Sequence, residues 1–190
     1  MGLTARKLDR EGFASLYETN MKEDFEGHGL KPFDMMQKMA EQGYYDCLGM
    51  FEGGELRGYA CLVREPERGY LLLDYLAVCS RCRDSGYGGK ILEKLREYYA
   101  GEKGIFLESE SVCAAPDEAE EQVCMRRIRF YQRHGCVHTR VKSWLFGHEY
   151  DIFYIPLLEE QPDIEQELHR IYQRMGLGKL YKGNVRIWSR

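Results

Sequence analysis

The sequence predicts a mixed α/β (α+β) fold, in which a mixed central sheet is flanked by helices and an added helix follows near the C-terminus. Three observations support this prediction. Strand-like and helix-like apolar patterns alternate along the 190 residues. Residues 70–78 form a nearly continuous apolar run, which suits a strand in the middle of a sheet. A glycine-rich stretch follows that run and leads directly into a segment with helical periodicity.

The first half of the chain reads as a strand, two helices and a hairpin. Asp9 is a typical N-cap residue, and Gly43 is a typical helix stop. Gly53 and Gly54 separate two apolar runs, and a tight hairpin turn needs the positive φ that glycine adopts readily. The predicted elements are a strand at 3–8, helices at 9–21 and 32–42, and strands at 45–51 and 55–64.

The second half continues the alternation of strands and helices. The helix at 116–134 has an acidic first turn and a basic last turn, an arrangement that the helix dipole favours. The predicted elements are strands at 70–78 and 104–112, helices at 86–100 and 116–134, strands at 136–146 and 149–157, and a tail helix at 163–175. We predict one domain at residues 1–158 and a helical extension, residues 159–190, packed on that domain.

Composition excludes several classes of function. The net charge of −4 argues against nucleic acid as the main partner, because phosphate contacts need a clustered positive surface. No apolar run is long enough to cross a membrane, and the N-terminus lacks the apolar stretch of a signal peptide. A cytoplasmic protein with seven reduced cysteines is therefore expected. Cys79 and Cys82 have no second pair at ligand spacing, so no metal site is predicted.

The stretch Arg83-Asp84-Ser85-Gly86-Tyr87-Gly88-Gly89 lies between a buried strand and a helix. Glycines let a ligand approach the backbone closely, and the first turn of a helix offers N–H groups without intrahelical partners. These features favour a phosphate site. The spacing fits neither a P-loop nor a dinucleotide fingerprint, so an ATP or NAD site is a distant alternative. A tight connection without a ligand is the other alternative.

Two segments carry a resemblance to a known family. Leu76-Ala77-Val78, followed after four residues by Arg-x-x-Gly-x-Gly at 83–88, resembles the acyl-CoA-binding motif of the GNAT N-acetyltransferase superfamily. Phe130-Tyr131 followed by Gly135 resembles the late helix of the same fold. The resemblance covers residues 56–139 and implies the GNAT acyl-CoA N-acyltransferase fold with acetyl-CoA (coenzyme A) as cofactor. An asparagine common in the family is replaced by Cys124.

The resemblance also implies which residues hold the cofactor. The backbone of the glycine turn would grip the diphosphate, and the end of the preceding strand would pair with the pantetheine arm. The expected cofactor-binding residues are Leu76, Ala77, Val78, Arg83, Asp84, Ser85, Gly86, Tyr87, Gly88 and Gly89.

The family mechanism is direct attack of a neutral amine on the thioester. Tyr131 occupies the position of the family's proton donor, although it could instead be a core residue beside Phe130. Glu108 is the first candidate for the general base and Asp74 the second, while Glu110 shares a strand face with Glu108. For each acid, a salt-bridged or solvated role is the alternative.

The expected function is acetyl transfer to a primary amine of a small molecule or peptide, without nucleic acid or membrane partners. A non-catalytic acyl-CoA sensor on the same fold is the alternative. The tail helix would cover the acceptor cleft or form a homodimer contact. A basic group on the late helix has three readings: RNA binding, contact with the cofactor's 3′-phosphate, or complementarity to the helix dipole. It comprises Arg126, Arg127, Arg129 and Arg133.

Overall fold

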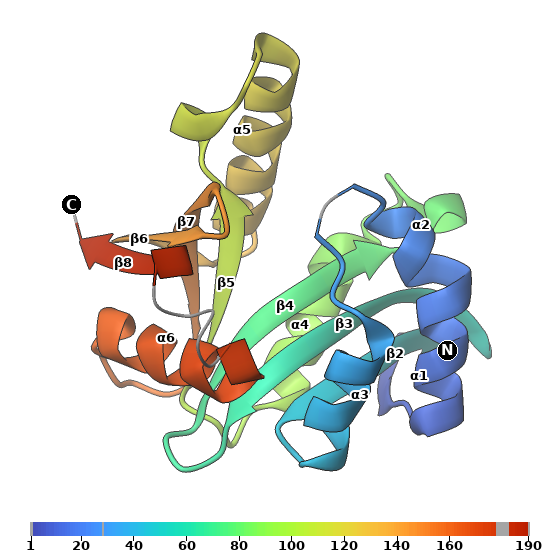
Figure 1. Ribbon diagram of the computed structural model, residues 1–190. Helices are drawn as coiled ribbons and strands as arrows, with labels where there is room; N and C mark the ends of the chain where they lie inside the picture. Colours follow the sequence, from blue (N-terminus) through green and yellow to red (C-terminus); the bar gives the residue numbers. More distant parts are fainter. Residues whose placement is uncertain (1, 28, 178–182, 190) are drawn as a thin grey trace. The chain divides into compact units, whose positions relative to one another are not determined.

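The computed structural model describes residues 2–27, 29–177 and 183–189. Within them the strands form one eight-stranded mixed sheet in the order β1-β2-β3-β4-β5-β7-β6-β8, which confirms the predicted fold class (Figure 1). The strands are β1 Thr4–Lys7, β2 Tyr45–Glu52, β3 Glu55–Glu65, β4 Tyr70–Val78, β5 Gly104–Glu110, β6 Val137–Leu145, β7 His148–Pro156 and β8 Val185–Ser189. The helices are α1 Arg10–Leu16, α2 Lys22–Asp24, α3 Phe33–Glu41, α4 Tyr87–Tyr98, α5 Glu118–Arg133 and α6 Ile164–Tyr172.

The chain divides into two compact units. The first unit contains Met1–Arg64 and Asp74–Tyr99, and the second contains Glu65–Leu73 and Ala100–Arg190. Strand β4 contributes its first four residues to the second unit and the remainder to the first. The predicted boundary after residue 158 falls inside the second unit and stays a prediction.

The first unit is built on antiparallel pairing of β1 with β2 and of β2 with β3. The β2–β3 turn has Gly53 at φ 62° and Gly54 at φ 84°, which confirms the predicted hairpin. Successive side chains of a strand point to opposite faces. The ring of Tyr45 stacks on Phe13 of α1, whereas the neighbouring Asp46 accepts a hydrogen bond from Tyr99, just after α4. Helices α1 and α4 therefore cover opposite faces of these strands.

The N-terminal helical region differs from the single predicted helix. Asp9 caps α1 as expected, because its carboxylate accepts a hydrogen bond from the Gly12 amide at 2.8 Å. After Leu16 the chain continues through a π-helical turn, Tyr17–Met21, into the short helix α2. The apolar periodicity of residues 9–21 does not distinguish a π turn from an α turn, so this change could not be predicted.

The second unit is built around β5. It pairs in parallel with Tyr70–Leu73 of β4 and antiparallel with β7, which in turn pairs with β6. Tyr131 of α5 packs against Phe153, the register partner of Leu107. Because Glu108 follows Leu107, it points to the opposite face, where Tyr172 of α6 reaches it. Helices α5 and α6 thus cover opposite faces of β5 and β7.

Strand β8 was not among the predicted elements. The sequence analysis ends with the tail helix, whereas Val185–Ser189 pairs antiparallel with Val141–Leu145 of β6. The available signal was the short alternation of Val185 and Ile187 with polar or aromatic neighbours. A five-residue strand at the edge of a sheet is defined by its pairing partner more than by its own pattern.

Gly104 gives a first prediction, for stability. A Cβ at this position would lie well inside contact distance of the Tyr154 ring, whose hydroxyl donates to the Lys103 carbonyl at 3.1 Å. Gly104→Ala is therefore expected to lower the free energy of unfolding by about 1–3 kcal/mol, as for other overpacked cores. At Gly101 an added Cβ meets nothing within 4 Å, so Gly101→Ala is the matched control. Denaturant titration should separate the two variants, and equal stability would contradict the described packing.

Candidate functional site

The glycine turn opens α4 without help from a side chain. Gly86 is the N-cap at φ 78°, and no side chain in the described part of the chain caps the helix. Asp84 also has a positive φ, 60°, a conformation that aspartate tolerates better than most residues. The amides of the first helical turn have no intrahelical acceptors, and the helix dipole places partial positive charge there. The turn therefore has the chemistry to hold a phosphate group.

Gly86 has room around it. A Cβ built at this position would meet no heavy atom within 4 Å, so the backbone is open on this side. Close approach of a diphosphate to main-chain amides needs such openness. The residues present thus fit a coenzyme A diphosphate.

The side chain of Arg83 is held by a carboxylate. Its guanidinium forms an ion pair of 2.7 Å with Asp24 at the end of α2. Asp24 is almost buried, at 7% side-chain exposure, and also accepts a hydrogen bond of 2.8 Å from the Tyr59 hydroxyl. Burial, followed by this hydrogen bond, raises the pKa of Tyr59. The N-terminal helical segment is thereby tied to the glycine turn, a link that sequence reasoning missed.

Two other side chains of the turn also form hydrogen bonds within the first unit. The Ser85 hydroxyl donates to the Arg83 carbonyl at 3.3 Å. The Tyr87 hydroxyl donates to Glu52 at the end of β2, and this hydrogen bond raises the pKa of Tyr87. These contacts leave the main-chain amides of the turn as its anion-binding groups.

The strand end that precedes the turn is closely packed against β3. Leu76, Ala77 and Val78 are each partly buried, and the Cys79 amide donates to the Arg57 carbonyl at 3.0 Å. A Cβ at Gly58 would approach the Ala77 carbonyl oxygen to 2.6 Å. Glycine at 58 is therefore needed for the observed path of this strand end.

Asp74 is engaged by two partners on neighbouring elements. Lys31 forms an ion pair of 2.6 Å with it, and the buried Tyr45 hydroxyl donates to its other oxygen at 2.8 Å. The Asp74 side chain is only 5% exposed. Nearby, the Tyr75 hydroxyl donates to the Gly29 carbonyl at 3.2 Å, so this part of β4 anchors the segment before α3. These contacts favour a structural role, and a role as base stays a second proposal.

A second prediction tests the structural role of Asp74. Asp74→Asn leaves the Lys31 ammonium without its carboxylate, so the free energy of unfolding should fall by roughly 2–3 kcal/mol. The exposed Asp34, in the first turn of α3, provides a matched Asp34→Asn control with little expected change. Thermal denaturation of both variants measures the difference. Equal melting temperatures would show that the ion pair contributes little.

Glu108 is partly buried and accepts hydrogen bonds from two hydroxyl groups. Tyr172 of α6 and Ser143 of β6 both donate to the same oxygen, Oε1, the latter at 3.0 Å. Its strand neighbour Glu110 is instead paired with Arg127 at 2.8 Å. Sequence reasoning did not find Tyr172 or Ser143, because nothing in their local patterns shows that they meet this carboxylate.

Tyr131 packs beside Phe130, as its interpretation as a core residue expected, and its role as proton donor stays a prediction. Its ring contacts Phe130 and Phe153 with centroid separations of 5.3 and 5.5 Å. Burial raises the pKa of Tyr131 to about 12, although Arg127 acts in the opposite direction. Within the described residues no side-chain hydrogen bond engages its hydroxyl. The phenol is therefore protonated at neutral pH and able to donate.

The predicted residues fall into two groups. The glycine turn, the end of β4 and Asp74 belong to the first unit, whereas Glu108 and Tyr131 belong to the second. Within the second unit, Glu108 and Tyr131 lie on opposite faces of the sheet, since one meets α6 and the other contacts Phe153. Their catalytic roles stay proposals.

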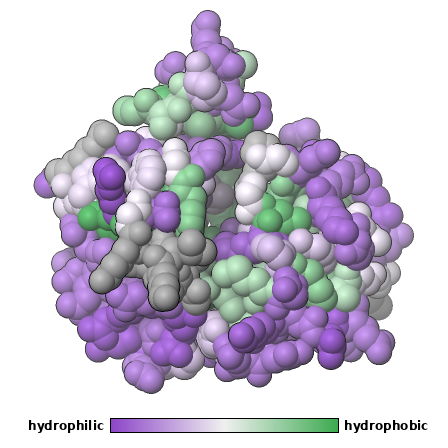
Figure 2. Space-filling view, viewed as in Figure 1, coloured by the Kyte–Doolittle hydropathy of each residue, from purple (hydrophilic) through white to green (hydrophobic). Residues whose placement is uncertain are grey.

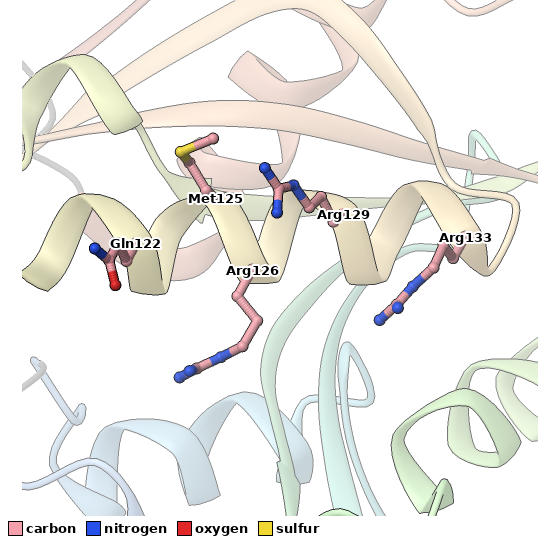
Figure 3. A pocket seen from close by; sticks show the side chains of 5 residues that line it. All are labelled: Gln122, Met125, Arg126, Arg129 and Arg133. Carbon is pink, nitrogen blue, oxygen red and sulfur yellow. The ribbon is translucent and has the colours of Figure 1, made fainter.

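Three arginines of α5 line a surface hollow. Its walls are formed by Gln122, Met125, Arg126, Arg129 and Arg133 (Figure 3). Figure 3 shows Arg126 and Arg133 pointing to the same side of the helix. Arg133 lies in the last turn, where the dipole favours a cation. Arg127 lies outside this set and is paired with Glu110, so the four arginines are not equivalent.

Figure 2 shows hydrophilic residues over most of the visible face, with smaller hydrophobic areas between them. No helix in the described ranges is long and apolar enough to span a membrane. In those same ranges, no three His, Cys, Asp or Glu side chains are grouped to hold a metal ion. Cys79 and Cys82 are both buried thiols at the short turn before Arg83.

Comparisons with solved structures agree with the fold. A GNAT-family acetyltransferase structure from Bacteroides thetaiotaomicron is 20% identical, with a TM-score of 0.66 over 91% of this chain and 97% of that one. Spermidine N-acetyltransferase from Vibrio cholerae, in complex with CoA and spermine, is 13% identical, with a TM-score of 0.61 over 82% and 95%. The ribosomal-protein-S18-alanine N-acetyltransferase from Escherichia coli is 15% identical, with a TM-score of 0.58 over 85% and 98%.

No curated protein sequence matches the chain. The family model for the acetyltransferase (GNAT) family matches residues 13–136, which include β4, the glycine turn, α4, β5 and α5. Acetyltransferases of this family use acetyl-CoA as acyl donor. The sequence motifs, the open N-terminus of α4 and this match agree, and the chain belongs to the acetyltransferase (GNAT) family.

Proposed function

We propose that this chain transfers the acetyl group of acetyl-CoA to a primary amine of a small molecule or peptide, by direct attack of the amine on the thioester. The observation that carries this proposal is the uncapped N-terminus of α4, preceded by Gly86 in an open left-handed conformation. Such a turn provides main-chain donors for a diphosphate and leaves space for the ligand to approach the protein backbone.

The binding roles follow from the positions of the residues. The amides of the turn, from Asp84 to Gly89, hold the diphosphate, since the Arg83 amide already donates to the Ser80 carbonyl at 3.4 Å. The main chain of Leu76 and Val78 pairs with the pantetheine arm, so plain aliphatic side chains suffice there. Asp24 keeps the Arg83 side chain in place beside the turn.

Bound acetyl-CoA supplies the acetyl group as an activated thioester. Glu108 accepts a proton from the amine through water, because it lies on the opposite sheet face from Tyr131. The proton must be lost first, since an alkylammonium group with a pKa near 10 cannot attack. As the new C–N bond forms and the C–S bond breaks, Tyr131 donates its hydroxyl proton to the departing sulfur. The nitrogen loses its second proton through water as the amide forms, and that proton restores the Tyr131 hydroxyl. Asp74 is the second candidate for the base.

The acceptor is proposed only as a class. The similar structures are named for two kinds of amine, spermidine in the Vibrio cholerae enzyme and an alanine of ribosomal protein S18 in the Escherichia coli enzyme. Both are primary amines, which supports an amine acceptor here without selecting its size. A cytoplasmic location and a homodimer also stay proposals.

Two measurements test the function. Isothermal calorimetry with the full chain should detect CoA and acetyl-CoA but neither ATP nor NAD. Acetyl-CoA consumption is then followed with a panel of polyamines, amino acids and N-terminal peptides. Binding without turnover of any amine would favour the non-catalytic sensor, and absence of CoA binding would remove both alternatives.

A further inference from the structure

The tail of the chain supplies a contact to the candidate base. Helix α6, Ile164–Tyr172, lies beyond residues 13–136, which match the family model. Its residues Leu168, Ile171 and Tyr172 are buried, with exposures of 0%, 0% and 1%. The Tyr172 hydroxyl donates to Oε1 of Glu108. A residue outside the matched region thus contacts the carboxylate to which we assign proton transfer.

Ion pairs hold the chain on both sides of Tyr172, one within α6 and one in the turn that follows it. Five residues earlier, the buried Glu167 accepts two hydrogen bonds from Arg68, at 2.8 and 3.1 Å. Two residues later, Arg174 donates to both oxygens of Glu65, at 2.6 and 2.9 Å. The Arg174–Glu65 pair is bidentate, which restricts orientation as well as distance, whereas both Arg68 donors meet the same oxygen of Glu167. The segment that carries Tyr172 is therefore held against the end of β3 and the loop between β3 and β4.

The two hydroxyl donors act on one oxygen of Glu108. Ser143, on β6, donates at 3.0 Å from a strand of the same sheet, while Tyr172 donates from the helix above it. Both side chains are buried, with exposures of 0% for Ser143 and 1% for Tyr172, so both donor oxygens are held by packing. Tyr172 reaches the carboxylate from outside the sheet, and together with Ser143 it defines the orientation of Glu108.

We propose that Tyr172 is a positioning residue, which orients the Glu108 carboxylate for proton transfer from the acceptor amine. The inference rests on the proposed function, because it assigns Tyr172 an effect through Glu108. With this inference, the proposed active site includes a residue from the C-terminal segment.

The test uses the full chain and acetyl transfer to the best amine of the panel. Tyr172→Phe keeps the ring and removes only the hydroxyl, so kcat should fall by at least about tenfold, as expected when a reacting group loses its orientation. The KM for acetyl-CoA should stay within about twofold. Tyr154→Phe is the matched control, since Tyr154 lies on the same sheet face but donates to the Lys103 carbonyl.

A double-mutant cycle separates positioning from packing. If Tyr172 acts through Glu108, Tyr172→Phe should have no further effect on kcat in the Glu108→Gln background. An undiminished effect in that background, or unchanged kcat in the single variant, overturns the inference while the wild-type chain remains active. If the wild-type chain binds CoA but acetylates no amine, the proposed function itself fails.

Discussion

Replacing Tyr131 with phenylalanine is expected to lower kcat by about 100-fold or more, with little change in affinity for acetyl-CoA. A positioned general acid contributes factors of this size, and removal of the hydroxyl leaves the departing thiolate without its donor. The raised pKa of Tyr131, about 12, keeps the phenol protonated throughout the neutral range. Phenylalanine preserves the ring contacts with Phe130 and Phe153.

The control for this variant is Tyr98→Phe, because Tyr98 is an exposed residue at the end of α4. Steady-state kinetics with the same amine should leave it indistinguishable from the wild type. If Tyr131→Phe retains full kcat, Tyr131 is a packing residue, and the proton must come from elsewhere.

At Gly86 we expect two substitutions to differ in their effect. Gly86→Val should weaken CoA binding by about tenfold or more, because a β-branched residue strongly disfavours φ 78° and the free turn should leave the binding conformation. A cost of 1.4 kcal/mol corresponds to one factor of ten in affinity. Gly86→Asn should lose less affinity than the valine variant, since asparagine tolerates this conformation and its Cβ meets no protein atom within 4 Å.

Calorimetric titration with CoA measures both variants, and circular dichroism checks that both fold. Equal affinity of the valine variant and the wild type would falsify the assignment of the diphosphate to this turn. Equal loss in both variants would instead indicate that a ligand group approaches the Gly86 Cα too closely for any side chain.

The sequence predicted the parts of the fold that depend on local patterns. Gly53-Gly54 marks a hairpin and Asp9 caps a helix, and both signals act over a few residues. The N-terminus of α4 was predicted within one residue for the same reason. Strand β8 was missed because its stability comes from pairing with β6.

The candidate site was less accessible to sequence reasoning than the fold. The glycine turn could be found because its function lies in its own backbone. The partners of Arg83, Asp74 and Glu108 could not, since Asp24, Lys31 and Tyr172 are distant along the chain. Only the folded sheet and helices bring these groups within hydrogen-bonding distance.

Strand β5 has a practical consequence for anyone who shortens this protein. All seven of its residues, Gly104–Glu110, pair with β7, which lies after the region shared with the family model. A fragment trimmed to residues 13–136 would present a bare row of backbone donors and acceptors along β5. Such an edge recruits strands from other molecules. Precipitation of that fragment would therefore reflect the missing β7, not a defect in cofactor recognition.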